Sequence, residues 1–248
     1  MAKPEPFSYE RPIIEGVARI AVDTLGAPDA LSRLNQLVDQ AAGFAEHILD
    51  DVRAKEPPSQ PVACKKGCAF CCHGQEVQVS PPETLRIAAF LAEHAATAAI
   101  AKLLERVREV EAMKERHREE GRGRASFPCP LLEDGACSVY PVRPFVCRGF
   151  NSYDARACEL NRIHLVDDAR IVGYAHQDRI AQSALGGLRV ALAALGLDAD
   201  VLDLAPALRI AFTEKDVARR WLAGEPVFAE AKARLAGNDE LPSLLTRH

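Results

Sequence analysis

The sequence has no excess of basic charge and no hydrophobic run long enough to cross a bilayer. Its 31 lysine and arginine residues are outnumbered by 35 aspartate and glutamate residues, which gives a formal net charge of −4. A general nucleic-acid-binding role lacks electrostatic support, because such proteins present a basic surface. The longest apolar stretches, such as residues 190–197, are far shorter than the roughly 20 residues of a transmembrane helix. We therefore expect neither nucleic acid nor membrane as a partner.

Other common signatures are missing as well. The first residues include Glu5, Glu10 and Glu15 without an apolar core run, which is not the pattern of a secretory signal. We find no repeat at a solenoid period and no glycine-rich cofactor loop. We also find no nucleophile–base pair or paired carboxylates whose spacing rises above chance. The sequence predicts a cytoplasmic protein whose catalytic residues, if it is an enzyme, are unknown.

Cysteine, by contrast, is plentiful, with eight in a chain of 248 residues. Disulfide frameworks belong mainly to small secreted chains with thin cores. Four of these cysteines lie within nine residues, and such near neighbours pair poorly because a disulfide needs Cα atoms about 5–6 Å apart with converging side chains. The pattern favours metal ligation over disulfides for this first set, Cys64, Cys68, Cys71 and Cys72.

A second set follows in a segment rich in proline and aromatic residues, and it consists of Cys129, Cys137, Cys147 and Cys158. Thiolates gathered from short loops are how proteins hold zinc or iron–sulfur clusters. Asp134-Gly135 predicts a tight hairpin turn between the first two of these cysteines. Zinc ribbons show two C-x2-C pairs, and only Cys68 and Cys71 have that spacing. We expect all eight cysteines as candidate ligands of a [4Fe–4S] cluster or, as the alternative, of zinc.

Two further expectations concern the surroundings of the ligands. The side chains of Cys71 and Cys72 diverge in regular conformations, so Cys72 is expected to reach a second metal or to serve in packing or redox chemistry. Eight thiols suffice for one four-thiolate site and a partial or full second one. A thiolate centre is anionic, and we expect Arg143 and Arg148 to support the cofactor from outside its ligand shell.

Helical spacing of apolar residues dominates the rest of the chain. Ser80 and Glu83 have the spacing of a capping box, with prolines in the first turn between them. Thr213 and Asp216 resemble a second capping pair, and residues 75–79 give a weak strand signal. The expected helices cover residues 13–25, 29–56, 80–91, 100–113, 171–195 and 200–212, with another after Thr213.

We therefore predict a mostly α protein, a single helical domain around an irregular cysteine-rich metal-binding centre with at most a short hairpin. The domain spans residues 13–236, with the cysteine region at about 60–160, flanking helices in 13–56 and 165–236, and tails at 1–12 and 237–248. The two helices between Ser80 and Glu120 are expected to fold back on each other and bring Cys129 near Cys64.

Part of the first set, C-x3-C-x2-C from Cys64 to Cys71, is similar to the cluster motif of radical S-adenosylmethionine enzymes. That family needs a long barrel of alternating strands and helices after the motif, whereas this chain continues in helices and a second cysteine set. The fold expectation therefore disfavours this resemblance.

The whole constellation resembles the YkgJ-type cysteine-cluster family of zinc- or iron-chelating domains, over about residues 60–160. The resemblance rests on C-x3-C-x2-C-C from Cys64, C-P-L-L from Cys129, C-S-V-Y from Cys137, Arg143-Pro144, Cys147-Arg148 and the trailing Cys158. It implies an intracellular metal-binding protein, with an iron–sulfur centre, of unassigned role and with an unknown protein partner. A related group, the larger flagellin lysine N-methylases, adds S-adenosylmethionine-dependent methylation of a protein lysine as one alternative. A structural zinc protein is the other.

Overall fold

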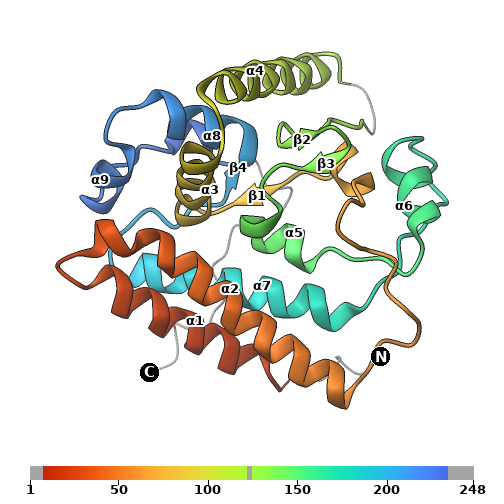
Figure 1. Ribbon diagram of the computed structural model, residues 1–248, viewed down its shortest axis with the longest axis horizontal. Coiled ribbons are helices and arrows are strands. Elements are labelled where there is room, and N and C mark those ends of the chain that lie inside the picture. Colours follow the sequence, from red (N-terminus) through yellow and green to blue (C-terminus); the bar gives the residue numbers. More distant parts are fainter. Residues whose placement is uncertain (1–7, 122–124, 234–248) are drawn as a thin grey trace.

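The computed structural model describes residues 8–121 and 125–233, and within them helices dominate over two short two-stranded sheets. The prediction of a mostly α protein is confirmed. Figure 1 shows a lower layer of helices, an upper layer, and an irregular region with short helices at one side. The predicted tail at residues 237–248 lies outside the described part, as do residues 1–7 of the predicted N-terminal tail.

The lower layer consists of α1 (Glu10–Leu25), α2 (Ala30–Lys55) and α7 (Ala175–Ala194) (Figure 1). Since α1 begins at Glu10, the predicted tail at 1–12 extends too far into the chain. Ile13 and Val17 are fully buried on the face of α1 that packs on α7. Gly187 permits this close crossing, because a Cβ there would lie 2.5 Å from the carbonyl oxygen of Ile14. Helix α7 starts four residues later than the sequence pattern predicts.

The upper layer consists of α3 (Pro81–His94), α4 (Thr97–Glu119), α8 (Leu204–Thr213), α9 (Val217–Leu222) and the 3-10 helix η3 (Ala229–Ala231). The capping box at the start of α3 is confirmed: the Ser80 hydroxyl accepts the Glu83 amide, and the Glu83 carboxylate accepts the Ser80 amide. The capping pair predicted before α9 is wrong. The Thr213 hydroxyl instead donates to the Arg209 carbonyl of α8, and Asp216 adopts a left-handed conformation (φ 52°) without capping α9 through its side chain.

A short sheet ties the cysteine region to this upper layer. Strand β1 (Gln78–Val79) pairs antiparallel with β4 (Leu202–Asp203), and the register places Gln78 opposite Asp203. The weak strand signal before Ser80 is therefore confirmed for two residues. The partner strand lies more than 120 residues away in the sequence, so this pairing fixes the exit of the first cysteine segment against α8.

The irregular region holds the remaining elements, which are η1 (Phe70–His73), β2 (Leu132–Glu133), β3 (Ala136–Cys137), η2 (Tyr140–Val142), α5 (Phe145–Gly149) and α6 (Ala155–Arg162). Strands β2 and β3 form the predicted hairpin. Its turn residues Asp134 and Gly135 both have positive φ, at 48° and 74°, the geometry that favours aspartate-glycine turns. The hairpin presents Cys137 at its second strand.

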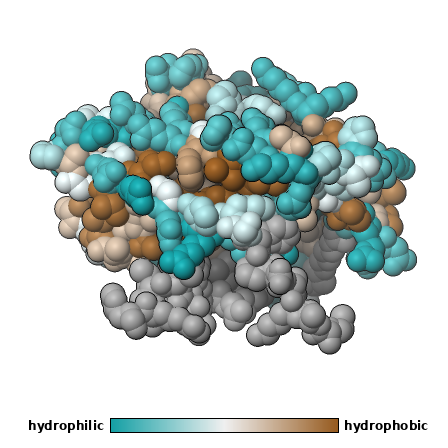
Figure 2. Space-filling view, turned by 90° about the horizontal axis from the view of Figure 1, so that it is seen from below, coloured by the Kyte–Doolittle hydropathy of each residue, from teal (hydrophilic) through white to brown (hydrophobic). Residues whose placement is uncertain are grey.

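One continuous cluster of buried apolar side chains runs through both layers, and it includes the fully buried Trp221, Phe145 and Phe228. Polar and apolar residues alternate over the underside of the molecule (Figure 2). Val22 on α1 and Leu31 on α2 are both 41% exposed. Within the described residues, every helix is too short or too polar to cross a membrane.

Candidate metal centre

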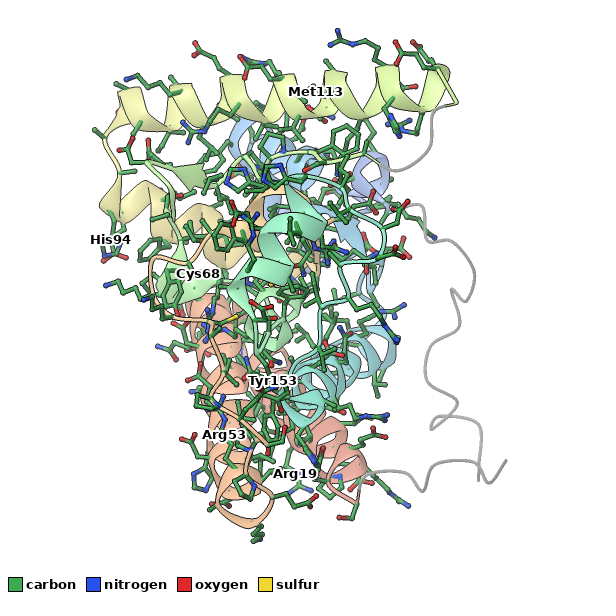
Figure 3. The ribbon with its side chains drawn as sticks, turned by 90° about the vertical axis from the view of Figure 1, so that its right-hand side faces the viewer. Arg19, Arg53, Cys68, His94, Met113 and Tyr153 are labelled. Atoms are coloured by element: carbon green, nitrogen blue, oxygen red, sulfur yellow. The ribbon has the colours of Figure 1, made fainter. Side chains whose placement is uncertain are left out.

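The two cysteine segments meet in the structure. The main-chain amide of Cys129 donates a hydrogen bond of 2.6 Å to the carbonyl oxygen of Cys72. Next to this contact, the Ser126 hydroxyl is within hydrogen-bonding distance of the carbonyl oxygens of His73 and Arg162. All eight cysteines are free thiols, and Figure 3 shows Cys68 at mid-height of the molecule between His94 and Arg53. Residues far apart in the sequence thus converge on one region.

Ser152 links two thiols from opposite ends of the cysteine region. Its carbonyl oxygen accepts the Ala63 amide at 2.8 Å, which fixes the chain entering Cys64. Burial raises the pKa of the Cys64 thiol, and a hydrogen bond from the Ser152 amide opposes that shift. Burial likewise raises the pKa of the Cys158 thiol, opposed by a hydrogen bond with the Ser152 side chain. Because one buried serine contacts both sulfurs, Cys64 and Cys158 lie close together.

Three other thiols border the hydrophobic core. Cys129, Cys137 and Cys147 are partly buried and pack against it. Burial raises the pKa of Cys129 to about 12 and that of Cys147 well above its ordinary value. The charges of Cys129 and Cys137 raise the pKa of Cys147 further, so the three sulfurs share one neighbourhood. At neutral pH these thiols remain protonated unless a cation joins them.

The neighbours Cys71 and Cys72 differ from the sequence-based expectation. They lie in the tight turn of η1, and their side chains are hydrogen-bonded to each other. The sequence-based expectation of diverging side chains applied to a regular α-helix or strand, whereas in the 3-10 turn of η1 the two side chains are close enough to share a hydrogen bond. The hydrogen bond from Cys72 lowers the pKa of Cys71 to about 7 and raises the pKa of Cys72. Cys71 is therefore the thiol most readily ionised at neutral pH among those with a resolved shift.

Arg143 and Arg148, the two predicted supporting cations, have different positions. The Arg143 guanidinium lies 4.3 Å from the centre of the Tyr140 ring, and its charge opposes the burial that raises the pKa of Cys137. Arg148 forms an ion pair with Glu46 of α2, and it donates to the carbonyl oxygens of Arg143 and Pro141. Arg148 therefore braces the loop before α5 against α2.

Sequence reasoning missed a third cation, Arg162. Its charge lowers the pKa of Cys71, after the larger effect of Cys72, and it opposes the burial that raises the pKa of Cys158. Its guanidinium donates to the Gly74 carbonyl oxygen at 3.2 Å and lies 5.2 Å from the centre of the Phe150 ring. The available signal was its position four residues after Cys158, one turn along the same helix face.

The residues present fit a thiophilic metal by their donor type. Soft thiolate ligands select zinc, Cu(I) and iron–sulfur clusters, and the gathered donors are all sulfur. Among the residues of the two described ranges, no three cysteine, histidine, aspartate or glutamate side chains already stand as a coordination shell. Instead, Cys71 and Cys72 are hydrogen-bonded to each other, and Cys64 and Cys158 are hydrogen-bonded to Ser152.

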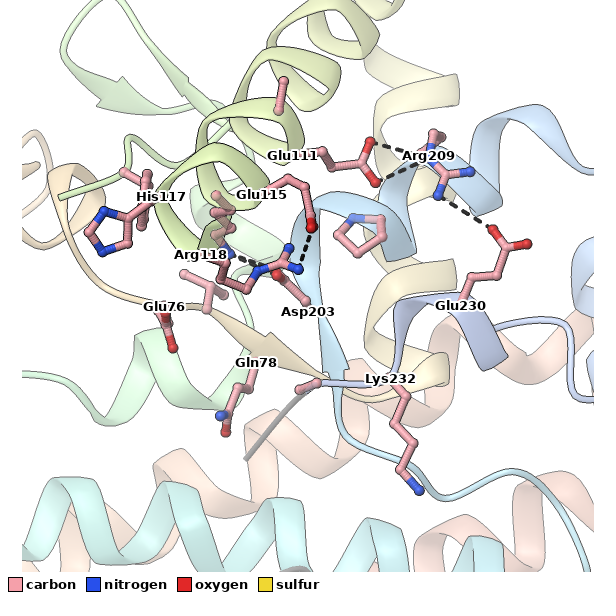
Figure 4. Close-up of a pocket in the computed structure, with 16 residues that line it drawn as sticks. Glu76, Gln78, Glu111, Glu115, His117, Arg118, Asp203, Arg209, Glu230 and Lys232 are labelled. Atoms are coloured by element: carbon pink, nitrogen blue, oxygen red, sulfur yellow. Dashed lines mark hydrogen bonds and ion pairs between the residues drawn. The ribbon is translucent and has the colours of Figure 1, made fainter. Parts of the chain in front are cut away.

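A cavity of about 600 Å³ lies beside this region, between α4, the β1–β4 sheet and α8 (Figure 4). Its wall carries charges of both signs, and most are already paired. Lys114 donates to both carboxylate oxygens of Asp203 at 2.8 and 2.9 Å, and Arg209 binds Glu111. A much smaller cavity shares Lys114 and Asp203 with it and reaches Cys129.

The fold and the site together define a class: a helical protein in which two distant cysteine segments are held against each other. Residues 63–165 match the family model CxxCxxCC, described as a putative zinc- or iron-chelating domain. The match confirms the resemblance seen in the sequence, and the matched span includes all eight cysteines. No curated protein and no solved structure matches the chain.

Proposed function

We propose that the protein binds a metal centre through its cysteine thiolates, that the centre is a [4Fe–4S] cluster, and that zinc is the alternative. The observation that carries the proposal is the hydrogen bond from Cys129 to Cys72, which joins the two cysteine segments of a domain whose family is described as zinc- or iron-chelating. Neither segment alone supplies a regular zinc-finger spacing, so joint ligation favours a cluster over a zinc knuckle.

The environment of the thiols supports this proposal. Burial raises the pKa of Cys129 and Cys147, so ionising them without a partner costs free energy. A metal cation supplies the missing positive charge, and its binding releases the thiol protons. Lys114 opposes the shift at Cys129, and Arg143 opposes it at Cys137. Protein cations thus already offset part of the negative charge that a thiolate centre carries.

Anaerobic purification followed by visible absorption and by iron, sulfide and zinc analysis tests the proposal. A cluster gives a coloured protein with iron and acid-labile sulfide in equal amounts. A colourless protein with stoichiometric zinc removes the iron–sulfur form and keeps the metal site. A metal-free protein with unchanged helical content, obtained from iron- and zinc-replete cells, removes both.

The role that follows is that of a cytoplasmic metal-site protein serving a redox or assembly partner, which is a protein still to be identified. In this role the protein itself supplies every metal ligand. The enzyme alternative differs, because it requires an open coordination position or a cofactor pocket next to the cysteines.

The cavity between α4, the β1–β4 sheet and α8 makes methyl transfer to a protein lysine the second candidate. Its volume of about 600 Å³ falls in the range of small-molecule and cofactor sites, and the adjoining small cavity reaches the thiol region. Calorimetric titration with S-adenosylmethionine tests this candidate. Tight binding that Asp203→Asn weakens would favour it, whereas no heat at millimolar ligand would exclude it.

A further inference from the structure

We infer that the eight thiols form two separate four-thiolate centres, each of which binds a thiophilic metal ion or cluster. This inference rests on the proposed function. The outer centre consists of Cys64, Cys68, Cys71 and Cys158. The inner centre consists of Cys72, Cys129, Cys137 and Cys147. One zinc ion or one [4Fe–4S] cluster takes four thiolates, so a single centre would leave four gathered thiols without a metal.

The outer centre is built around Ser152. This serine is fully buried, its amide is hydrogen-bonded to the sulfur of Cys64, and its side chain is hydrogen-bonded to Cys158. Helix α6, which carries Cys158, packs on η1, which carries Cys71. Cys68 lies on the loop just before η1, and its charge acts on both Cys64 and Cys158. These contacts gather the four cysteines in one region between Ser152, η1 and α6.

The inner centre is built where the second cysteine segment meets the first. The amide of Cys129 binds the carbonyl of Cys72, and the charges of Cys129 and Cys137 act on the Cys72 thiol. Cys137 comes from strand β3 and Cys147 from α5. Both pack with Cys129 against the hydrophobic core, and Cys72 joins this group through the hydrogen bond to Cys129 rather than by packing there.

Cys71 and Cys72 mark the boundary between the two centres. They are adjacent and hydrogen-bonded, yet their wider surroundings differ. Cys72 is joined to the inner set by its carbonyl oxygen, which accepts the Cys129 amide. Cys71 acts on thiols of both sets, but it shares the cation Arg162 with Cys158, whose helix packs on η1. Assigning Cys71 to the outer centre and Cys72 to the inner centre gives each centre four ligands.

The two centres differ in their access to solvent. Cys64 is exposed, and the neighbouring Lys65 and Lys66 are exposed as well. Cys129, Cys137 and Cys147 are partly buried against the core, and Cys72 is partly buried as well. In the outer set Cys158 is buried, so solvent reaches that set from the side of Cys64. The outer centre is therefore the one that a protein partner or a chelator reaches directly, and the inner centre is the one that braces the fold.

Metal counting in matched cysteine variants tests the assignment. The full chain is purified anaerobically as wild type, Cys158→Ser and Cys147→Ser, and iron, zinc and acid-labile sulfide are measured per chain. We expect about half of the wild-type metal in each single variant and almost none in the double variant. Cys137→Ser replaces Cys147→Ser if the latter loses its helical content, because Cys137 lies on the hairpin rather than in a helix against the core.

The outcomes separate this inference from the proposed function. Wild-type protein with one zinc ion or one cluster per chain overturns the two-centre assignment and leaves metal binding intact. Folded Cys158→Ser protein that keeps all of its metal, or loses all of it, also overturns the assignment. Wild-type protein without metal overturns the proposed function itself.

Discussion

The carboxylate of Glu83 accepts the main-chain amide of Phe145 at 2.7 Å, across 62 positions of the sequence. The same carboxylate accepts the amide and the hydroxyl of Ser80, both at 2.8 Å. Glu83 is 2% exposed, so these hydrogen bonds replace its hydration. The contact joins the first turn of α3 to the first turn of α5, and it thereby fixes Cys147 relative to the segment that follows the first cysteine set.

Removing this buried acceptor is expected to destabilise the protein. Glu83→Ala leaves two buried amides and a hydroxyl without their partner, and each unsatisfied buried polar group costs about 1–3 kcal/mol. We therefore expect the free energy of unfolding to fall by about 2–5 kcal/mol in chemical denaturation. Glu93→Ala on the exposed face of the same helix is the control and should change it by less than about 0.5 kcal/mol. Equal effects of the two variants would contradict the role of Glu83.

Glu83 also predicts a pH dependence of stability. Burial raises the pKa of this carboxyl above its ordinary value of 4.5, so the folded protein holds the proton more tightly than the unfolded chain does. Its contribution is fully present below about pH 4.5 and is lost as pH rises through the raised pKa. Glu83→Gln removes this titration. The difference in unfolding free energy between wild type and Glu83→Gln should decline with rising pH in this window, and a pH-independent difference would contradict the shift.

Local patterns allowed part of this architecture to be predicted. The capping box of Ser80 and Glu83 depends on a spacing of three residues, and the hairpin turn at Asp134 depends on two adjacent residues. The failed capping pair shows the limit of such patterns. Thr213 has the right residue type, but its hydroxyl binds the Arg209 carbonyl in the last turn of α8, so the helix continues through the position where a cap was expected.

Contacts between segments that are far apart in the sequence could not be predicted from the sequence pattern. The cysteine spacing identified the thiols, but nothing in it showed that Ser152 contacts two of them or that Arg162 acts on Cys71. The tight turn of η1, which brings Cys71 and Cys72 together, is likewise set by the surrounding contacts rather than by local propensity. Such features require the relative placement of segments that are tens of residues apart.

Arg162 is expected to set the pH at which the outer thiols bind metal. Metal binding requires deprotonated thiols, and this cation favours the ionised forms of Cys71 and Cys158. Arg162→Gln should raise the midpoint of the pH titration of zinc binding by up to about one unit. Arg170→Gln, an exposed arginine after α6, should leave the midpoint unchanged. The same midpoint in both variants would show that Arg162 does not act on the ligands.

Metal removal is expected to lower the stability of the whole domain in two steps. A metal that binds only the folded state at 100 times its dissociation constant adds about 2.7 kcal/mol, which corresponds to about 5–10 °C in the melting temperature of a chain of this size. Chelator should release metal first from the exposed side near Cys64 and later from the buried side near Cys147. Circular dichroism melts at successive metal contents measure both effects. Metal release in one phase, or an unchanged melting temperature after full release, would contradict this expectation.

Ser152 offers the sharpest test of the outer thiols without touching a ligand. Ser152→Ala removes the side-chain hydrogen bond to Cys158, together with the hydrogen bonds of the hydroxyl with the carbonyl oxygen and the amide of Asp154, and it keeps the main-chain amide that is hydrogen-bonded to Cys64. Mutation of a group that hydrogen-bonds to a metal ligand typically changes metal affinity by 10–100-fold, and we expect a loss of about tenfold for the metal bound by the outer thiols. The affinity of the metal bound by the inner thiols should stay unchanged in competition titrations with a chelating dye. Ser183→Ala, a buried serine on α7, controls for the loss of a buried hydroxyl as such. If both serine variants weaken both metals alike, the effect is one of general stability, and Ser152 has no particular role in positioning Cys158.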